Sequence, residues 1–162
     1  MTLTMPRKFK IVAVGGTFDE LHKGHRMLLM KAFEVGEYIK VGITSDSFVK
    51  KIGKPHDPAP YTERLKELEA FLRDNDLMQR AEIVELNDAF GLTLQNGGIE
   101  ALIVSRETEP VARTINKKRN ELGRKPLSVV VINMVHSENH HPISTTRIRS
   151  GEIDREGRLL RK

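Results

Sequence analysis

The fold of this 162-residue chain is decided by the stretch Gly15-Gly16-Thr17-Phe18-Asp19-Glu20-Leu21-His22-Lys23-Gly24-His25. An apolar run at residues 11–14 precedes the stretch, and a helical pattern at residues 27–33 follows it. The order of strand, glycine turn and helix start predicts a phosphate site, because the first amides of a helix have no partner within it and lie at its positive end. His22 and His25 are expected on the same side of that opening.

The composition predicts a single globular domain. Apolar residues make up 38% of the chain and charged residues 30%. No apolar run reaches the roughly 18 residues of a membrane span, and residues 1–8 lack the apolar stretch of a signal peptide. The absence of cysteine excludes disulfides, thiolate metal sites and a cysteine nucleophile. We therefore expect a cytoplasmic domain over residues 1–162, with a core at about 9–151 and a basic tail at 152–162.

The charge of the chain favours anionic ligands. Its formal net charge is +5, and residues 146–162 carry six basic and three acidic side chains. Such a surface attracts the phosphates of nucleotides, nucleic acids or lipids. Aromatic residues make up only 5% of the chain and there is no Trp, so little material exists for stacking bases. A small polyphosphate ligand is favoured over a nucleic acid or a membrane.

Apolar runs and helical periodicity alternate along the chain. Strands are expected at residues 9–14, 38–43, 82–86, 101–104 and 127–135, and helices at 25–35, 61–73 and 110–122. We expect Thr62 to cap the second helix and Gly123 to end the third. Residues 50–60 read as a basic, proline-rich loop, and the tail as partly disordered or a last helix. The alternation predicts an α/β fold whose mainly parallel five-stranded sheet is covered by helices on both faces, with ligands bound beyond the carboxyl ends of the strands.

The opening stretch resembles a known signature. Gly-Thr-Phe-Asp followed by His-x-Gly-His is similar to the motif of the nucleotidyltransferase superfamily. Further segments resemble phosphopantetheine adenylyltransferases of the archaeal and eukaryotic type: Thr44-Ser45-Asp46, Pro60-Tyr61-Thr62-Glu63-Arg64, Ile103-Val104-Ser105-Arg106-Glu107-Thr108, Ile115-Asn116-Lys117-Lys118-Arg119 and Ile143-Ser144-Thr145-Thr146-Arg147-Ile148-Arg149. The resemblance covers residues 9 to about 151. It implies a Rossmann-like nucleotidyltransferase fold and a monomer that joins the adenylyl group of ATP, bound as its Mg²⁺ complex, to 4′-phosphopantetheine, giving dephospho-coenzyme A and pyrophosphate.

The resemblance also implies roles for individual residues. His25 is expected to stabilise the transition state, His22 to contact the triphosphate, and Lys51, with Lys50 as the alternative, to contact the acceptor phosphate. The hydroxyl of Thr17 suits the acceptor phosphate, and the lack of a side chain at Gly24 would allow close approach of ATP. The complete set of expected ligand-binding residues is Gly15, Gly16, Thr17, Phe18, His22, Gly24, His25, Ser105, Arg106, Ser144, Thr145, Thr146 and Arg147.

Several alternatives stay open at this stage. Relatives join nucleotides to nicotinamide mononucleotide, flavin mononucleotide or glycerol phosphate, although His140-His141-Pro142 differs from the tail motif of the glycerol-phosphate enzymes. A basic module that binds RNA or a membrane without catalysis is a further alternative. The cluster of His136, His140 and His141 could hold a metal, and Asp19 could cap a turn or help to hold Mg²⁺. Arg64 is expected to pair with Glu63 or Glu67, and Arg119 to approach the triphosphate.

Overall fold

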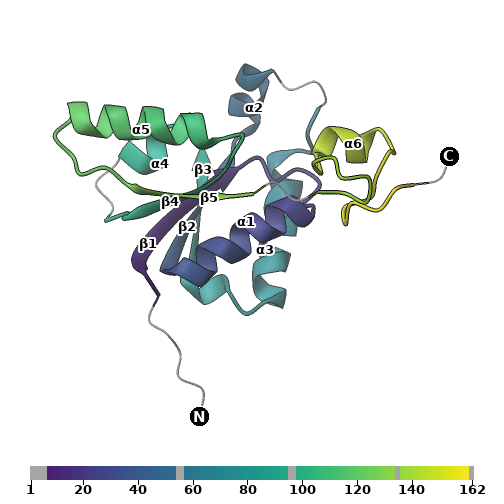
Figure 1. Ribbon diagram of the computed structural model, residues 1–162, viewed down its shortest axis with the longest axis horizontal. Coiled ribbons are helices and arrows are strands. Elements are labelled where there is room, and N and C mark those ends of the chain that lie inside the picture. Colours follow the sequence, from purple (N-terminus) through teal and green to yellow (C-terminus); the bar gives the residue numbers. More distant parts are fainter. Residues whose placement is uncertain (1–6, 54–56, 95–97, 134–135, 161–162) are drawn as a thin grey trace, which may run out of the picture.

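The computed structural model describes residues 7–53, 57–94, 98–133 and 136–160. Strands and helices alternate along these residues (Figure 1). Their order is β1 (Phe9–Gly16), α1 (Lys23–Val35), β2 (Gly36–Thr44), α2 (Asp46–Ile52), α3 (Tyr61–Asp74), a 3₁₀ turn (Met78–Arg80), β3 (Ala81–Leu86), α4 (Gly91–Leu94), β4 (Ala101–Ser105), α5 (Glu109–Glu121), β5 (Ser128–Ile132) and α6 (Thr145–Arg149).

The five strands form one parallel sheet in the order β3-β2-β1-β4-β5. The chain winds outward from β1 in one direction and then returns to add β4 and β5 on the other side, so strand order reverses between β1 and β4. Ligands of open α/β sheets bind outside the carboxyl ends of the strands at this point. The β1–β2 register continues to Gly16 opposite Ile43, whereas the β1–β4 register ends at Val14 opposite Ile103. Pairing between β1 and β4 therefore stops two residues before either strand ends, at the edge where a ligand is expected.

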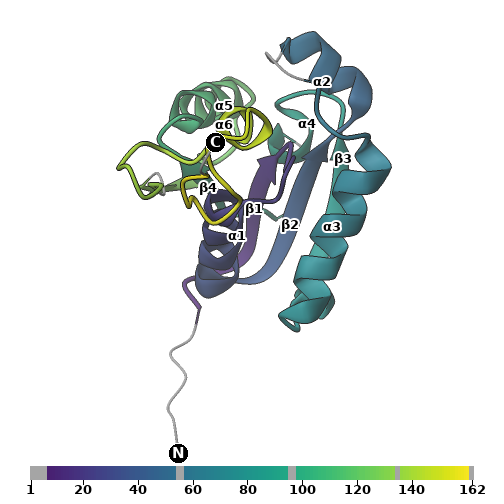
Figure 2. The same ribbon diagram turned by 90° about the vertical axis from the view of Figure 1, so that its right-hand side faces the viewer.

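Helices cover both faces of the sheet, as predicted (Figures 1 and 2). Successive residues of β1 point to opposite faces, and Val12 and Val14 are buried in a cluster with α1 and α3 while Ala13 is buried in a second cluster with α5. The first cluster includes Leu29 and Phe33 of α1 and Leu68 and Leu72 of α3; the second includes Ala112 and Ile115 of α5. This double burial explains the uninterrupted apolar runs at residues 11–14 of β1 and 101–104 of β4.

Several local expectations need correction. Pro60, not Thr62, is the N-cap of α3, and the amide of Tyr61 instead donates to the carboxylate of Asp46 over 2.9 Å. The expected loop after residue 50 begins later, because Ser45 caps the short helix α2 and Gly53, at φ 68°, ends it. The expected strand at residues 127–135 is shorter, and residues 134–135 lie outside the described part of the chain. Gly123 does follow the end of α5, at φ 71°.

The segment 152–160 is not a helix. Ile153 is fully buried and forms an isolated antiparallel bridge with Leu159, and the amide of Leu160 donates to the carbonyl of Glu152 over 3.0 Å. The segment therefore folds back on itself as an ordered irregular turn. Within the described residues, no helix combines the length and the apolar composition that a membrane crossing requires.

Candidate active site

Two imidazole rings stand at the start of α1, directly beyond β1. His22 is the N-cap of the helix, and its Nδ1 accepts the amides of Gly24 (3.0 Å) and His25 (3.4 Å). Nδ1 of His25 accepts the amide of His22 over 3.3 Å, so the two residues form a reciprocal capping box. The rings stack with their centroids 3.7 Å apart. Because Nδ1 of each ring accepts a main-chain hydrogen, each neutral ring carries its own proton on Nε2.

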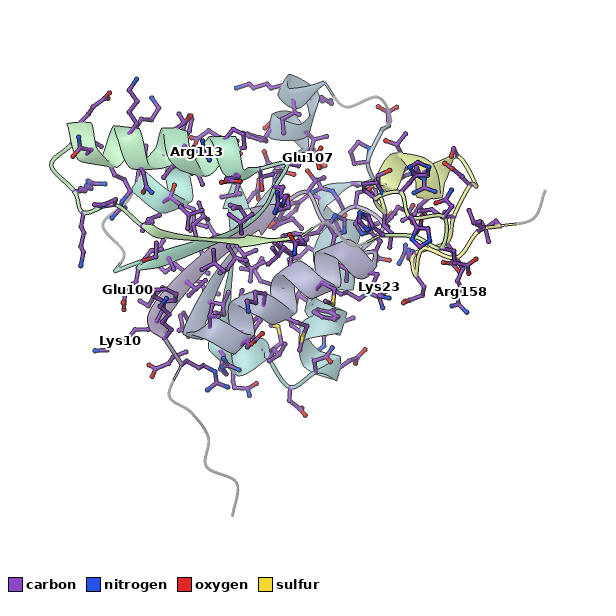
Figure 3. The ribbon with its side chains drawn as sticks, viewed as in Figure 1. Lys10, Lys23, Glu100, Glu107, Arg113 and Arg158 are labelled. Carbon is purple, nitrogen blue, oxygen red and sulfur yellow. The ribbon has the colours of Figure 1, made fainter. Side chains whose placement is uncertain are left out.

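The capping box changes how a phosphate would be held. The amide of Lys23 donates to the carbonyl of Arg155 over 2.8 Å, and the amides of Gly24 and His25 donate to His22. Lys23 accordingly lies near the same end of the molecule as Arg158, which belongs to the segment 152–160 (Figure 3). The expectation that the first amides of this helix lack a partner is therefore wrong, because the His22 side chain and the carbonyl of Arg155 already accept them.

His22 is 7% exposed, and burial lowers its pKa from 6.5 to about 4, with further lowering by the charges of Arg26 and Arg155. The charge of Asp19 acts in the opposite direction but is the smallest of the four causes. A histidine with this pKa is neutral at physiological pH. His22 can therefore donate a hydrogen bond from Nε2 without adding a positive charge to the site.

Gly24 is required by the protein itself. A Cβ built on Gly24 would lie 2.8 Å from Cε1 of His22 and 3.0 Å from its Nδ1. Real Cβ contacts of that length essentially do not occur, so a side chain at this position would displace the capping ring. The sequence interpretation assigned this glycine to close approach of ATP; the structure gives it an intramolecular reason.

The turn from β1 to α1 has an unusual backbone. Phe18 and Glu20 both have positive φ, at 52° and 58°, although neither is glycine. Such residues are strained and persist only where surrounding contacts impose them. Phe18 is fully buried and its ring meets that of His25 edge to face, with centroids 5.5 Å apart. The ring also packs beneath Gly16, where an added Cβ would lie 3.4 Å from it, at ordinary contact distance. Gly15 is exposed at the same edge.

Thr17 is held at the carboxyl ends of two strands. Its Oγ1 accepts the hydroxyl of Thr44 over 3.1 Å, which leaves the hydrogen of Thr17 itself to be donated. Nη1 of Arg64 donates to the carbonyls of Thr17 (3.0 Å) and Thr44 (2.8 Å). Arg64 is 1% exposed and is the largest fully buried side chain in the described residues.

Arg64 was misread from the sequence. Nε donates to the carbonyl of Ala59 over 2.8 Å, and Nη2 lies 3.1 Å from the carboxylate of Asp46. The expected pairing with Glu63 or Glu67 is wrong, and the arginine instead joins the ends of β1 and β2 to α2. Arg119 is also structural: it donates to the carbonyls of Lys125 and Thr93 rather than facing a triphosphate. The signal for a buried Arg64 was its place on the same helical face as the apolar Leu68.

Asp19 connects the turn to α6. Its carboxylate accepts Nε and Nη2 of Arg149 over 2.9 Å each, and the amide of Ala59 over 3.1 Å. The carbonyl of Asp19 accepts the hydroxyl of Thr145 over 3.1 Å. Asp19 is 2% exposed, so this carboxylate holds the fold together rather than facing solvent. The described residues contain no group of three or more His, Cys, Asp or Glu side chains that could hold a metal ion.

The predicted serine–threonine segment begins α6. Ser144 is its N-cap and accepts the amide of Arg147 over 3.2 Å, and Thr146 occupies an exposed position on the helix. Arg147 differs from expectation. Its guanidinium donates to Glu152, Ser137, Asn139 and the carbonyls of His141 and Pro142, and this side chain is 15% exposed. Arg147 thus organises the loop before α6, and the structure gives no support to its predicted contact with phosphate.

The remaining predicted residues lie on other elements that follow strands. Ser105 is the last residue of β4, and its amide donates to Thr108 over 3.1 Å; exposed Arg106 contacts Asn133. Lys50 and Lys51 are both exposed in the last turn of α2, where the helix dipole favours cations. The structure therefore places the predicted residues beyond the sheet, and it does not distinguish Lys51 from Lys50.

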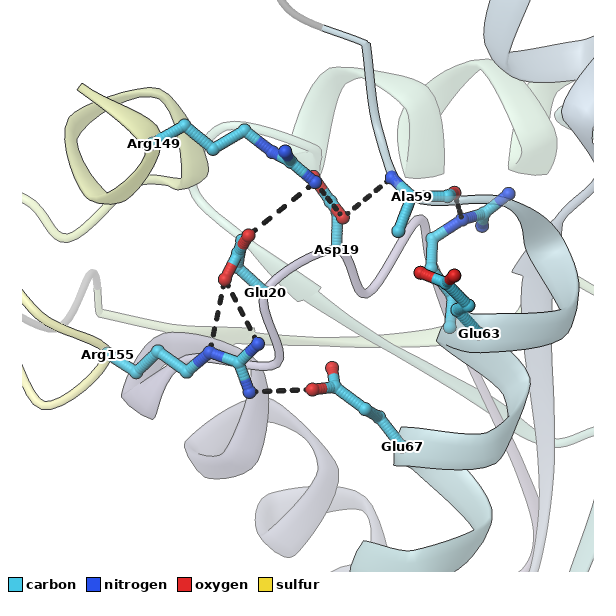
Figure 4. A pocket seen from close by; sticks show the side chains of 8 residues that line it. Asp19, Glu20, Ala59, Glu63, Glu67, Arg149 and Arg155 are labelled. Carbon is cyan, nitrogen blue, oxygen red and sulfur yellow. Dashed lines mark hydrogen bonds and ion pairs between the residues drawn. The ribbon is translucent and has the colours of Figure 1, made fainter. Parts of the chain in front are cut away.

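A cleft of about 410 Å³ lies beside the histidines. It is lined by Asp19, Glu20, Ala59, Glu63, Arg64, Glu67, Arg149 and Arg155 (Figure 4). Neither His22 nor His25 lines it, and its walls are arginine–carboxylate pairs. The cleft is thus bounded by the arginines and carboxylates that hold the turn after β1.

Comparisons with known proteins agree with this geometry. The family model described as cytidylyltransferase-like matches residues 13–151. A phosphopantetheine adenylyltransferase of Methanothermobacter thermautotrophicus is 47% identical over 98% of this chain and 94% of its own, and one of Pyrococcus abyssi is 43% identical over 96% and 98%. A solved structure of a protein of unknown function from Archaeoglobus fulgidus is 33% identical, with a TM-score of 0.64 over 75% of this chain and 87% of that one. By its sequence, its sheet order and its paired histidines, this chain belongs to the phosphopantetheine adenylyltransferase family of cytidylyltransferase-like proteins.

Proposed function

We propose that this protein transfers the adenylyl group of ATP to 4′-phosphopantetheine, giving dephospho-coenzyme A and pyrophosphate. Relatives more than 40% identical over nearly the whole chain bear the name of that activity. The observation that carries the mechanism is the reciprocal capping of His22 and His25, which directs Nδ1 of both rings to the main chain and assigns the proton of each to Nε2. Two adjacent imidazole donors at the end of β1 suit the oxygens of a triphosphate.

The reaction needs little proton transfer. An oxygen of the acceptor phosphate attacks the α-phosphorus in line, the bond from that phosphorus to the α–β bridging oxygen breaks, and pyrophosphate leaves with the electron pair. A phosphate monoester is already ionised at neutral pH, so a general base is unnecessary. The protein must align two polyanions and stabilise the charge on the α-phosphoryl oxygens and the leaving group.

The described residues divide this work. We assign Nε2 of His25 to the α-phosphoryl oxygens in the transition state and Nε2 of His22 to the triphosphate. The hydroxyl hydrogen of Thr17, whose oxygen already accepts from Thr44, is assigned to the acceptor phosphate. The exposed Lys51 of α2 adds positive charge from the neighbouring strand end. Ser105 and Arg106 are assigned to the nucleoside, and Ser144, Thr145 and Thr146 to the outer phosphates.

Magnesium is proposed as the partner of ATP rather than of the protein. Asp19, the carboxylate nearest in sequence to the histidines, is held by Arg149 and the amide of Ala59, so the donor set fits a protein-bound ion poorly. Mg²⁺ commonly keeps its waters and binds substrate phosphates. When bound to the triphosphate, it neutralises charge on the leaving pyrophosphate. We place the reaction in the cytoplasm and assign it to a monomer, which light scattering of the purified protein tests.

Pyrophosphate release from Mg-ATP tests the proposed function. The acceptors are 4′-phosphopantetheine, pantetheine without its phosphate, nicotinamide mononucleotide and flavin mononucleotide. Rapid release with 4′-phosphopantetheine alone, together with dephospho-coenzyme A identified by mass spectrometry, is the expected result. Release with either mononucleotide in place of 4′-phosphopantetheine would assign the protein to another nucleotidyltransferase reaction, and no release with any acceptor would favour a binding role.

A further inference from the structure

The segment 152–160, called the strap from here on, lies against the elements that carry the two histidines. It is closed by the Ile153–Leu159 bridge, and one carboxylate oxygen of Asp154 accepts the amides of Glu156 (2.9 Å) and Arg158 (2.8 Å). The fully buried side chain of Ile153 anchors it. The strap is therefore held in one shape by its own contacts, so a displacement of the strap would also displace the residues that it contacts.

The strap contacts the first turn of α1 at two points. The carbonyl of Arg155 accepts the amide of Lys23, the residue that follows the N-cap His22. The carboxylate of Glu156 pairs with Arg26, the residue that follows His25. One contact therefore lies within the capping box and the other directly after it, so a movement of the strap would move the helix turn on which both imidazoles depend.

Arg155 also forms hydrogen bonds with Glu20 in the strained turn before α1. Its Nε and Nη2 donate to one carboxylate oxygen of Glu20 over 3.1 and 3.0 Å, and Nη1 donates to Glu67 of α3 over 2.7 Å (Figure 4). The other carboxylate oxygen of Glu20 lies 3.5 Å from Arg149. Glu20 has a φ of 58°, a conformation that a non-glycine residue keeps only under external restraint. Arg155 is the residue that ties this restraint to a third element, α3.

A further contact links the strap to the loop that precedes α6. The amide of Glu138 donates to the carbonyl of Gly157 over 2.9 Å. Gly157 has a φ of 82°, and a Cβ there would lie 2.7 Å from Ile143, so this close approach depends on glycine. The strap thus contacts both the histidine turn and the segment that leads to Ser144.

We propose that the strap fixes the orientation of His22 and His25, and that Arg155 is a positioning residue for adenylyl transfer. Arg155 contacts the main chain and carboxylates of the framework, whereas the reacting atoms are contacted by the imidazoles. The proposal rests on the proposed function for its turnover measurements and on the geometry alone for its spectroscopic one. Small displacements of a group that stabilises a transition state reduce kcat strongly, because alignment contributes much of the rate.

The test compares Arg155→Ala with Arg158→Ala. Arg158 belongs to the same strap, but its side chain is 67% exposed and pairs only with Asp154 among the contacts described. We expect Arg155→Ala to lower kcat about tenfold while KM for ATP changes less than twofold, and Arg158→Ala to match the wild type. Arg155→Lys, which keeps one charge, should recover part of kcat. Equal kcat for Arg155→Ala and Arg158→Ala would overturn the proposal.

Two further measurements separate positioning from stability and from the proposed function. Assays run well below the unfolding midpoint of each variant, with the folded fraction verified by circular dichroism, exclude loss of folded enzyme. Imidazole signals of His22 and His25 in two-dimensional NMR should shift in Arg155→Ala and not in Arg158→Ala, a result that needs no turnover. Unchanged imidazole signals would overturn the positioning role, whereas failure of the wild-type protein to turn over would count against the proposed function alone.

Discussion

Asp19 and Arg149 are separated by 130 positions in the sequence and form a bidentate ion pair with two hydrogen bonds of 2.9 Å. The hydrogen bond to Asp19 is the main reason that the pKa of Arg149 is raised above its ordinary value. Together with the bond from Thr145 to the Asp19 carbonyl, the pair fixes α6 against the turn after β1. The histidines and the serine–threonine helix are therefore positioned by one shared carboxylate-bearing residue.

Removing Arg149 should destabilise the protein. In Arg149→Gln the buried carboxylate of Asp19 keeps the amide of Ala59 but loses the charge of Arg149. We expect a loss of about 2 kcal/mol in the free energy of unfolding, reduced from the value of a fully buried pair because Arg149 is 31% exposed. Urea denaturation measures it. Arg113→Gln is the matched control, since Arg113 is 78% exposed on α5 and, among the described residues, pairs only with Glu109 of its own helix (Figure 3). Equal midpoints for the two variants would contradict the role given to the pair.

Replacing His25 should affect the chemical step. We expect His25→Ala to lower kcat by a hundredfold or more, about 3 kcal/mol of transition-state stabilisation, with little change in KM for ATP. Steady-state release of pyrophosphate supplies both constants. A variant that turns over like the wild type would remove His25 from the mechanism.

His22 combines a structural and a chemical role that two substitutions can separate. His22→Ala loses both the N-cap and the Nε2 donor, and should unfold about 1 kcal/mol more easily than His22→Asn, whose side-chain oxygen can still accept the helix amides. Both variants should bind ATP more weakly, because both lack the imidazole. If His22→Asn kept wild-type affinity for ATP, the ring would serve the helix only.

Burial of His22 makes stability depend on pH. Its pKa is about 4 in the folded protein and 6.5 when exposed, so between these values the unfolded chain binds a proton that the native state does not. Stability therefore falls as the pH drops from 6.5 towards 4, by up to about 3 kcal/mol from this residue. His22→Asn lacks this contribution, and the difference between the two proteins in urea midpoints across that range isolates it. Parallel curves for wild type and His22→Asn would show that His22 titrates normally.

The two lysines of α2 provide a matched pair. We expect Lys51→Ala to raise KM for 4′-phosphopantetheine about tenfold or to lower kcat similarly, because a charge-assisted contact to phosphate is worth roughly 1.5–3 kcal/mol. Lys50→Ala has the same charge change and the same exposed helix end. A larger effect of Lys50→Ala would exchange the two roles, and wild-type behaviour of both variants would place the acceptor phosphate elsewhere.

The sequence predicted the order of strands and helices, because each of these elements depends on a local pattern of apolar residues. Apolar runs identified each strand, and glycines followed by a helical pattern after residue 14 identified the turn from β1 to α1. The role of the first helix amides was missed because histidine is not among the usual N-cap residues, so nothing indicated that His22 would accept them. The helix α2 was missed because its apolar residues are few and the prolines that follow it dominate the pattern.

The partners of the arginines could not be predicted. A basic residue beside a motif reads as a ligand contact or as a surface charge, and only the folded chain brings Arg147 to Glu152 and Asn139, or Arg64 to the carbonyls of Thr17 and Thr44. These contacts join segments that sequence patterns treat separately. The sequence therefore suggested substrate contacts for Arg147 and Arg119 and a local ion pair for Arg64, whereas all three arginines hold distant parts of the fold together.

The hydrogen bond from the amide of Lys23 to the carbonyl of Arg155 also has a consequence for folding during synthesis. On the ribosome, the signature histidines emerge early, yet the residues that hold their turn in place are made more than a hundred peptide bonds later. A nascent polypeptide can assemble its first strands and helices during synthesis, but the hydrogen bond from Lys23 to Arg155 can form only after residue 155 has been made.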